Sequence, residues 1–546
     1  MKFVSDHQEL LKLNNLFEYL EYTAKKYPKY LATQLLRGGN IYAHTFEELT
    51  SDARKFGNYL IANDIHKQHV SIIGNFSYEW LVSYFGILYS NNIAVPIDDG
   101  QSRERIFALL DRSEVNTVIA KRKLLSDEQE IEVGSKTIRI INHENVNDII
   151  TAEEYEHIKK HFEPPTLDSN AMIVYTSGTT GTSKGILLSH KNILHDTIAS
   201  LPYTGDYHSP IGSNSIKLLP PFHMFGISGE IFFFFYFGTS LCFSDNTLKD
   251  VALLIETFKP QVLFVVPQII EGIHKKIWAT AKKQGRQKKL KTALKLSSCL
   301  RRIKIDLRSI LFRSVKNALG GNLEMLICGG AAADEKIVAE MEEFGIIILL
   351  GYGITECSPF VSLNPPYQQR KGSVGFPYPE PFCSLKIEDS EILVSGSIVT
   401  RGYFNDHQAN EEAFDGKWFK TGDLGRLDDD GYLFLTGRKK NLIILNDGNN
   451  VSPEELEMKI SQSPIVDSVL VYAAERGQTP VLVASIYPNM QYCNANSITD
   501  IKGEAMKLIR QMNAENPKYM KIFDVEIRDI PFEKTAIGKI KRYLYQ

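Results

Sequence analysis

The chain has 546 residues, of which 43% are hydrophobic and 23% are charged. This length exceeds what a single hydrophobic core supports, so we expect a large domain with at least one smaller domain. The formal net charge of −3 argues against a nucleic-acid-binding protein. Residues 1–11 lack the apolar run of a secretory signal, and the six cysteines lack paired spacing. We therefore expect a cytoplasmic protein with reduced thiols and no zinc site.

Short apolar runs alternate with longer helical patterns through the first part of the chain. Residues 16–28 have the pattern of an amphipathic helix, and strand and helix patterns then alternate at 70–73, 78–90, 93–97, 103–110 and 117–120. This alternation implies crossover connections and parallel sheets with helices on both faces. The sequence therefore predicts an α/β fold, with further buried strands at 171–175, 185–188, 323–328 and 346–350.

A loop rich in glycine and hydroxyl residues separates the strands predicted at 171–175 and 185–188. Residues 174–185 contain six hydroxyl side chains, three glycines and Lys184. Glycines let the backbone approach a ligand, hydroxyls donate hydrogen bonds and the lysine adds positive charge, so the natural ligand is a polyphosphate. The spacing of Gly178, Gly181 and Lys184 does not fit the Walker A pattern. A plain linker would need neither the lysine nor the flanking strands.

Residues 218–226 present His223 between aromatic side chains, after two prolines that stop any helix. A lone histidine is more often structural, so the residues alone leave its role open. The apolar run at 231–237 is much shorter than the roughly twenty residues of a membrane span. We interpret the run as a core helix or strand, with the wall of an apolar substrate pocket as the alternative.

Glycine turns are predicted to follow the strands at 323–328 and 346–350. Ligands of open parallel sheets bind at the carboxyl ends of the strands, so both turns should face one crevice. Small residues after the first strand leave room for a flat base, and Tyr352 in the second turn can stack on it. In that turn Thr355 can bind phosphate, and Glu356 can hold Mg²⁺, a cation that prefers oxygen ligands.

Residues 271–320 hold fifteen Lys and Arg against two acidic residues. One interpretation is a solvated helical face. The other is that the basic segment 275–316 contacts anionic lipid headgroups, which would place the protein at the inner membrane surface.

The last hundred residues have a pattern of their own. A helix at 453–461, strands at 466–473 and 481–487 and a helix near 503–513 predict a small α+β domain. Before it, Asp423 follows a predicted tight turn, and near the end of the chain Lys539 follows Gly538 in a basic tail.

Five segments resemble the signatures of the ANL adenylating enzymes, a family of acyl-CoA synthetases, adenylation domains and luciferases. They lie at 175–185, 351–356, 420–423, 437–440 and 538–542. The resemblance covers nearly the whole chain and is strongest to bacterial long-chain fatty acid acyl-CoA synthetases. It implies an N-terminal adenylating domain at 1–439 and a mobile C-terminal lid domain at 440–546.

The resemblance also implies roles for individual residues. The nucleotide is expected to contact Thr176, Ser177, Gly178, Thr179, Thr180, Gly181, Lys184, Gly330, Ala331, Gly351, Tyr352, Gly353, Thr355, Asp423 and Arg438. The expected catalytic residues are Lys539, Thr355, Glu356, which also holds Mg²⁺, and His223 at the acyl site, and the expected hinge is Lys440. Two residues depart from the family pattern: Cys357, interpreted as pocket lining, and Asn441, where an aspartate is common.

The expected reaction uses ATP and Mg²⁺ to convert a hydrophobic carboxylic acid, a medium- or long-chain fatty acid, into acyl-AMP. The acyl group then passes to CoA. A stand-alone enzyme that loads the phosphopantetheine of an acyl carrier protein shares every motif, and light emission in the luciferase manner also fits them. A non-catalytic nucleotide-binding scaffold is disfavoured by the joint presence of Lys184, Glu356, Asp423, Arg438 and Lys539.

Overall fold

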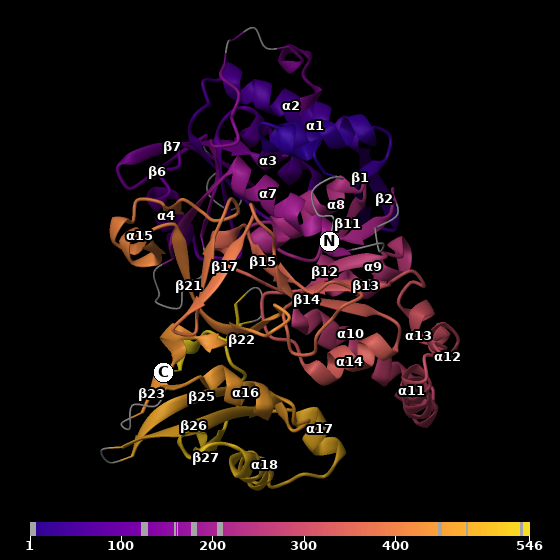
Figure 1. Ribbon diagram of the computed structural model, residues 1–546. Helices are drawn as coiled ribbons and strands as arrows, with labels where there is room; N and C mark the ends of the chain where they lie inside the picture. Colours follow the sequence, from indigo (N-terminus) through magenta and orange to yellow (C-terminus); the bar gives the residue numbers. More distant parts are fainter. Residues whose placement is uncertain are drawn as a thin grey trace.

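The structure is a computed structural model that describes residues 7–121, 129–157, 160, 162–175, 183–204, 211–445, 450–476, 479–535 and 539–545. Four sheets with their helices build a large N-terminal part, and a smaller C-terminal part lies below it in Figure 1. The predicted α/β fold with a large and a small domain is confirmed.

The largest sheet has eight strands in the order β19-β9-β8-β4-β3-β5-β7-β6. Its centre is parallel, because β3 pairs in parallel with β4 and β5, β4 with β8, and β5 with β7. β9 returns antiparallel to β8, as a hairpin. The strands are β3 (His69–Ile73), β4 (Ile93–Ile97), β5 (Thr117–Ala120), β6 (Glu130–Val133), β7 (Lys136–Asn142), β8 (Asn170–Tyr175), β9 (Gly185–Ser189) and β19 (Gly402–Tyr403).

Helices cover both faces of this sheet. Ile72 faces a core that includes side chains of α1, α2 and α3, among other helices, whereas its neighbour Ile73 faces a second core shared with α4, as the alternation of strand side chains requires. A glycine contact brings α2 and α3 together, since a Cβ on Gly57 would lie 2.9 Å from the Gly86 carbonyl oxygen. The helices are α1 (Leu16–Lys26), α2 (Phe46–Ala62), α3 (Tyr78–Tyr89), α4 (Arg103–Arg112), α6 (Val146–Thr151) and α7 (His190–Ser200).

The second sheet carries the two predicted glycine turns. It begins with three parallel strands, β12 (Val262–Val265), β13 (Met325–Cys328) and β14 (Ile347–Gly353), and ends with β15 (Phe360–Leu363) and β16 (Phe376–Pro377), which run antiparallel. The helices beside it are α9 (Thr247–Phe258), α10 (Pro267–Lys283), α11 (Gln287–Arg302), α12 (Arg308–Leu311), α13 (Arg313–Ala318) and α14 (Glu335–Glu343).

Two further sheets complete the N-terminal part. One has the order β10-β11-β1-β2, and its strands are β1 (Leu31–Arg37), β2 (Asn40–Thr45), β10 (Asn214–Ile216) and β11 (Ser240–Ser244). The other is antiparallel, has the helix α15 (His407–Ala413) beside it, and consists of β17 (Ser384–Glu388), β18 (Glu391–Ser395), β20 (Phe414–Asp415), β21 (Trp418–Leu427) and β22 (Leu433–Arg438).

The C-terminal part is built on a three-stranded sheet in the order β25-β26-β27. Its own core joins the sheet to the helices α16, α17 and α18. The strands are β23 (Ile443–Ile444), β24 (Asn450–Val451), β25 (Val466–Arg476), β26 (Thr479–Pro488) and β27 (Ile522–Ile527), and the helices are α16 (Pro453–Ser461), α17 (Met490–Ala495) and α18 (Ile501–Glu515).

Two predicted turns are wrong, because their glycines lie inside strands. The strand β14 continues through Gly353, where a Cβ would lie 2.0 Å from the Pro359 carbonyl oxygen, so the glycine allows β15 to approach. Asp423 likewise lies inside β21, after Gly422, whose φ of +69° is left-handed. In both places glycine serves close packing or an unusual backbone angle without reversing the chain.

The apolar run at 231–237 continues a π-helix, Phe225–Phe232, into α8 (Phe233–Tyr236). Phe232 and Phe235 are buried and pack against Phe85, so they belong to the core, as the first interpretation predicts. Among the described residues, no helix is long and apolar enough to span a bilayer.

Candidate active site

The carboxyl ends of β13 and β14 lie side by side, because Cys328 pairs in parallel register with Leu350. Gly330 and Ala331 follow the first strand, and Gly330 has a left-handed φ of +87°. A Cβ on Gly329 would lie 3.4 Å from the ring of Phe225 and 3.7 Å from the Gly351 carbonyl oxygen. The two predicted glycine segments therefore face each other, as expected for a ligand site at the end of a sheet.

The carboxylate of Asp423 lies where the sheet that contains β21 and β22 meets the strand β14. The Nε of Arg438 is 2.7 Å from Oδ1 of Asp423, its partner in the register of β21 and β22. The hydroxyl of Tyr352 donates to Oδ2 of Asp423 at 2.8 Å. Tyr352 is buried, and its hydroxyl holds the Asp423 carboxylate in place. Its expected stacking on a base stays a prediction.

A second carboxylate, Glu356, lies in the short 3₁₀ turn after β14. The hydroxyl of Tyr403 donates to its Oε1 at 3.0 Å, and the Nζ of Lys184 lies 4.6 Å from the centre of the Tyr403 ring. Surrounding protein raises the pKa of Glu356 by removing water from the carboxylate. A desolvated carboxylate is a group that gains from a bound cation.

Lys539, from the C-terminal part, lies within electrostatic range of these residues. Loss of solvation and the charges of Arg438 and Lys440 lower its pKa to about 8, while Asp423 and Glu356 act in the opposite direction. The Lys539 charge in turn helps to lower the pKa of His223 to about 4, although loss of solvation is the larger cause. The structure therefore brings the tail lysine into the same cluster as the two carboxylates and the histidine.

Lys440 also faces this cluster. Its pKa is lowered, first by loss of solvation and then by Arg438, whereas Asp423 and Glu356 raise it and Lys184 lowers it. Lys184, Arg438, Lys440 and Lys539 thus surround two carboxylates with four cationic side chains. This local excess of positive charge complements a polyphosphate.

His223 is held by a buried ion pair that the sequence did not predict. Lys217 and Glu230 are 2.5 Å apart, with side chains 1% and 0% exposed. The Glu230 carboxylate accepts from the backbone N–H groups of Leu218 and Leu219, and Lys217 donates to the Leu219 carbonyl. The pair therefore ties residues 217–219, which precede His223, to a side chain of the π-helix.

Tyr403 and the pair Lys217–Glu230 are the functional candidates that the sequence analysis did not name. Tyr403 belongs to none of the five motifs and reaches Glu356 only through folding, so the sequence gave no signal for it. For the pair Lys217–Glu230 a signal existed, because each charge directly borders an apolar run and buried charges need partners.

Other predicted residues have simpler placements. Thr355 begins the turn that carries Glu356, and Cys357 is buried, which raises its pKa. A Cβ on Gly351 would lie 2.9 Å from the Leu363 side chain, so this position has little room for a larger residue. The loop residues Thr176, Ser177, Gly178, Thr179, Thr180 and Gly181 lie outside the described residues.

The described side chains fit Mg²⁺ only in company with a substrate. Among them no group of three or more His, Cys, Asp or Glu could hold a metal ion. Mg²⁺ commonly takes one or two carboxylates together with phosphate oxygens and water, and Glu356 supplies such a carboxylate. Bound there, the ion would neutralise phosphate charge.

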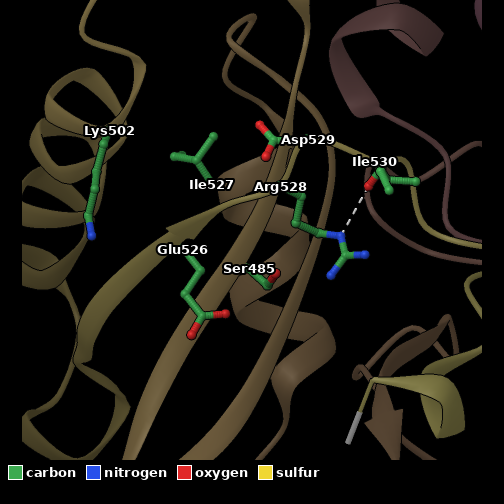
Figure 2. Close-up of a pocket in the computed structure, with 7 residues that line it drawn as sticks. All are labelled: Ser485, Lys502, Glu526, Ile527, Arg528, Asp529 and Ile530. Atoms are coloured by element: carbon green, nitrogen blue, oxygen red, sulfur yellow. Dashed lines mark hydrogen bonds between the residues drawn. The ribbon is translucent and has the colours of Figure 1, made fainter.

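A hollow on the surface of the C-terminal part contains none of these groups. Arg528 donates there from Nε to the Ile530 carbonyl at 3.2 Å (Figure 2). The lining residues are Ser485, Lys502, Glu526, Ile527, Arg528, Asp529 and Ile530. This hollow is separate from the site that contains Lys539.

The fold combines a large and a smaller part, and its site gathers two carboxylates and an excess of cationic side chains, which is the arrangement expected of an adenylating enzyme. The profile of the AMP-binding enzyme family matches residues 20–404, and that of the AMP-binding enzyme C-terminal domain matches residues 440–545. The chain belongs to the AMP-binding enzyme family.

Individual relatives agree with this assignment. The long-chain-fatty-acid–CoA ligase FadD15 of Mycobacterium bovis is 27% identical over 94% of this chain and 92% of its own length. The o-succinylbenzoate CoA synthetase MenE of Bacillus subtilis, in complex with the acyl-adenylate OSB-AMP, has a TM-score of 0.73 at 21% identity and covers 98% of each chain. ATP-bound MatB of Rhodopseudomonas palustris has a TM-score of 0.76 at 20% identity and covers 97% of this chain and 98% of its own.

Proposed function

We propose that the protein is an AMP-forming acid–CoA ligase that activates a hydrophobic carboxylic acid, a medium- or long-chain fatty acid. The observation that carries the proposal is that Lys539 lies within electrostatic range of Arg438, Asp423 and Glu356. These groups match what acyl-adenylate formation needs, which is to hold an anionic acid against an anionic nucleotide.

In the first step a carboxylate oxygen attacks the α-phosphorus of ATP, a new P–O bond forms, and the bond to pyrophosphate breaks. Lys539 neutralises the carboxylate and the α-phosphate as they approach, and the loop 176–184 holds the β- and γ-phosphates. Asp423 accepts hydrogen bonds from the ribose hydroxyls, and Arg438 and Tyr352 fix the orientation of its carboxylate. Thr355 donates to the α-phosphate, and Glu356 would hold a Mg²⁺ ion that neutralises phosphate charge.

In the second step the sulfur of CoA attacks the acyl carbon and AMP leaves. Lys539 would obstruct this approach, so we propose that residues 440–546 form a lid that turns about Lys440. One contact across this boundary is a hydrogen bond between exposed groups, from Lys336 Nζ to the Gln462 carbonyl at 3.3 Å. Such contacts can be exchanged at small cost.

The acid is expected to be uncharged beyond its carboxylate. His223 is neutral at physiological pH, because its pKa is lowered to about 4, and it offers no charge to a substrate ammonium. Support for a fatty acid comes from the name of the M. bovis relative, which this chain matches over 94% of its length.

The test is pyrophosphate release over a series of straight-chain acids and benzoates, with the thioester product identified separately for CoA and for a holo-carrier protein. Release that rises with chain length and a CoA thioester product support the proposal. Preference for benzoates, or transfer only to the carrier protein, would replace the proposed substrate or acceptor.

A further inference from the structure

The basic arm, which we define as residues 286–313, is a strongly charged surface outside the site. It holds ten Lys and Arg against Asp306 as its one acidic residue. Asp306 is itself neutralised by Arg308, at 2.7 Å. The arm contains α11 and α12 and lies at the outer edge of the N-terminal part (Figure 1).

One face of α11 is fixed against the protein. Ser297 donates to Glu343 of α14 at 2.8 Å, Arg301 pairs with the same carboxylate at 2.6 Å, and Leu290 and Leu294 pack on the core. Because this face of α11 is fixed against the protein, the side chains on the other side of the helix point to solvent.

The opposite face of α11 carries four exposed cations at helical spacing. They are Lys288, Lys291, Lys295 and Arg302. Residues three, four and seven apart share one side of a helix, so the four form a stripe. In the described part of the chain no ion pair joins any of them to an acidic group.

Beyond the helix the chain exposes an apolar tip. Ile303 is 65% exposed, Ile305 44%, Leu307 36% and Ile310 71%. Single exposed apolar residues are ordinary, but four large ones within eight residues form a patch that favours a partner.

We propose that the basic arm docks this protein on an anionic lipid bilayer, with the stripe on the headgroups and the apolar tip in the interface. The combination decides the partner. Lipid surfaces accept both cations and apolar side chains. Single-stranded nucleic acid is bound by aromatic stacking as well as charge, and Phe312, the arm's only aromatic residue, is buried. The proposal does not depend on which acid is activated.

The test is flotation of the full chain with vesicles of phosphatidylcholine, alone or mixed with phosphatidylglycerol. We expect binding to the anionic vesicles only, and its loss near 1 M salt, where the Debye length is about 3 Å. Each cation at a membrane surface contributes roughly a fivefold gain in partition. Neutralising the stripe (K288Q, K291Q, K295Q and R302Q together) should therefore reduce binding at least tenfold.

A matched control neutralises four exposed lysines elsewhere, Lys25, Lys29, Lys502 and Lys521, and should retain binding within about twofold. Replacing Ile303 and Ile310 with serine should weaken binding without changing its dependence on salt. Pyrophosphate release from a water-soluble acid should stay the same in all these variants, which separates this test from that of the enzymatic activity.

Cys299 gives a direct reading, since it is exposed while the other five cysteines are buried. It lies eleven residues from Lys288 and hence on the same side of α11. A polarity-sensitive dye on this thiol should shift to the blue with anionic vesicles. No shift, equal binding to neutral vesicles, equal loss in the control, or binding to RNA or an acidic protein in place of vesicles would overturn the proposal.

Discussion

Asp423 and Lys539 belong to the same charge cluster, but the chain holds them in different ways. Asp423 lies in a strand, is paired with Arg438 across β21 and β22 and accepts from Tyr352 of another sheet. Lys539 is bonded through its backbone to Thr535 of the C-terminal part: its carbonyl accepts from the Thr535 N–H at 2.7 Å, and its N–H donates to the Thr535 hydroxyl at 3.1 Å. The groups proposed to serve both chemical steps are thus built into sheets, and the group proposed for one step lies in the C-terminal part.

The largest expected effect is on the stability of the N-terminal part, which contains the buried ion pair Lys217–Glu230. Glu230→Gln leaves the Lys217 ammonium buried without a counter-charge, which typically costs about 3–5 kcal/mol. All three tryptophans precede residue 440, so tryptophan fluorescence during urea unfolding reports on the N-terminal part alone.

The matched control is the double variant Lys217→Met with Glu230→Gln, which removes the charge but keeps an acceptor for the Leu218 and Leu219 N–H groups. It should recover at least half of the lost stability. If the single variant unfolds like the native protein, the pair is not what anchors the His223 segment.

A backbone change at the boundary should affect only one of the two steps. Lys440 lies in a 3₁₀ turn, whose φ suits proline, so Lys440→Pro should tolerate the present arrangement and resist rotation. We expect adenylate formation within about twofold of native and thiolation reduced about tenfold or more, measured separately.

Lys440→Ala is the companion variant, because it removes the same charge and leaves the backbone free. If proline and alanine slow thiolation equally, the effect belongs to the side chain, and the proposed pivot is wrong.

The pH dependence should also distinguish the two halves. The Lys539 ammonium is present below its pKa of about 8 and is lost as the pH rises through that value. The kcat/KM for adenylation should therefore fall about tenfold per pH unit above roughly 8, because this parameter reports the free enzyme. Arginine stays charged, so Lys539→Arg should remove this alkaline limb, whatever its effect on the rate.

The rate of thiolation of supplied acyl-AMP should not fall as the pH rises through this value. A limb that persists in Lys539→Arg would assign the titration to another group.

The smallest effect concerns the hydrogen bond from Tyr403 to Glu356. Tyr403→Phe keeps the ring beneath Lys184 and removes one donor, which is worth about 0.5–1.5 kcal/mol, or roughly a two- to twelvefold loss of adenylation. The loss should grow at low Mg²⁺. Tyr432→Phe makes the same chemical change at a bond to the Gln368 carbonyl, away from the cluster, and should leave the rate unchanged.

Periodicity was sufficient to predict the framework. The strands β4 and β5 begin and end at the residues predicted, and so does the helix α16. It failed at Gly353 and Gly422, because glycine was interpreted as a turn former where the fold uses it for close packing or a left-handed angle inside a strand.

The site divides in the same manner. Glu356, Asp423, Arg438 and Lys539 were found because each lies in a contiguous motif. Tyr403 acts through a contact between distant elements, which no local pattern contains. The pair Lys217–Glu230 left only an indirect signal, two charges that border apolar runs. The domain boundary at 440 and the individual catalytic roles stay predictions.

The most direct test of the division of labour is Lys539→Ala, assayed separately for each half-reaction. Removing one preorganised charge from the first step should lower adenylate formation by about 10²–10³, while supplied acyl-AMP is still converted to the CoA thioester within about twofold of the native rate. Equal loss of both half-reactions would contradict a lysine that serves one step only.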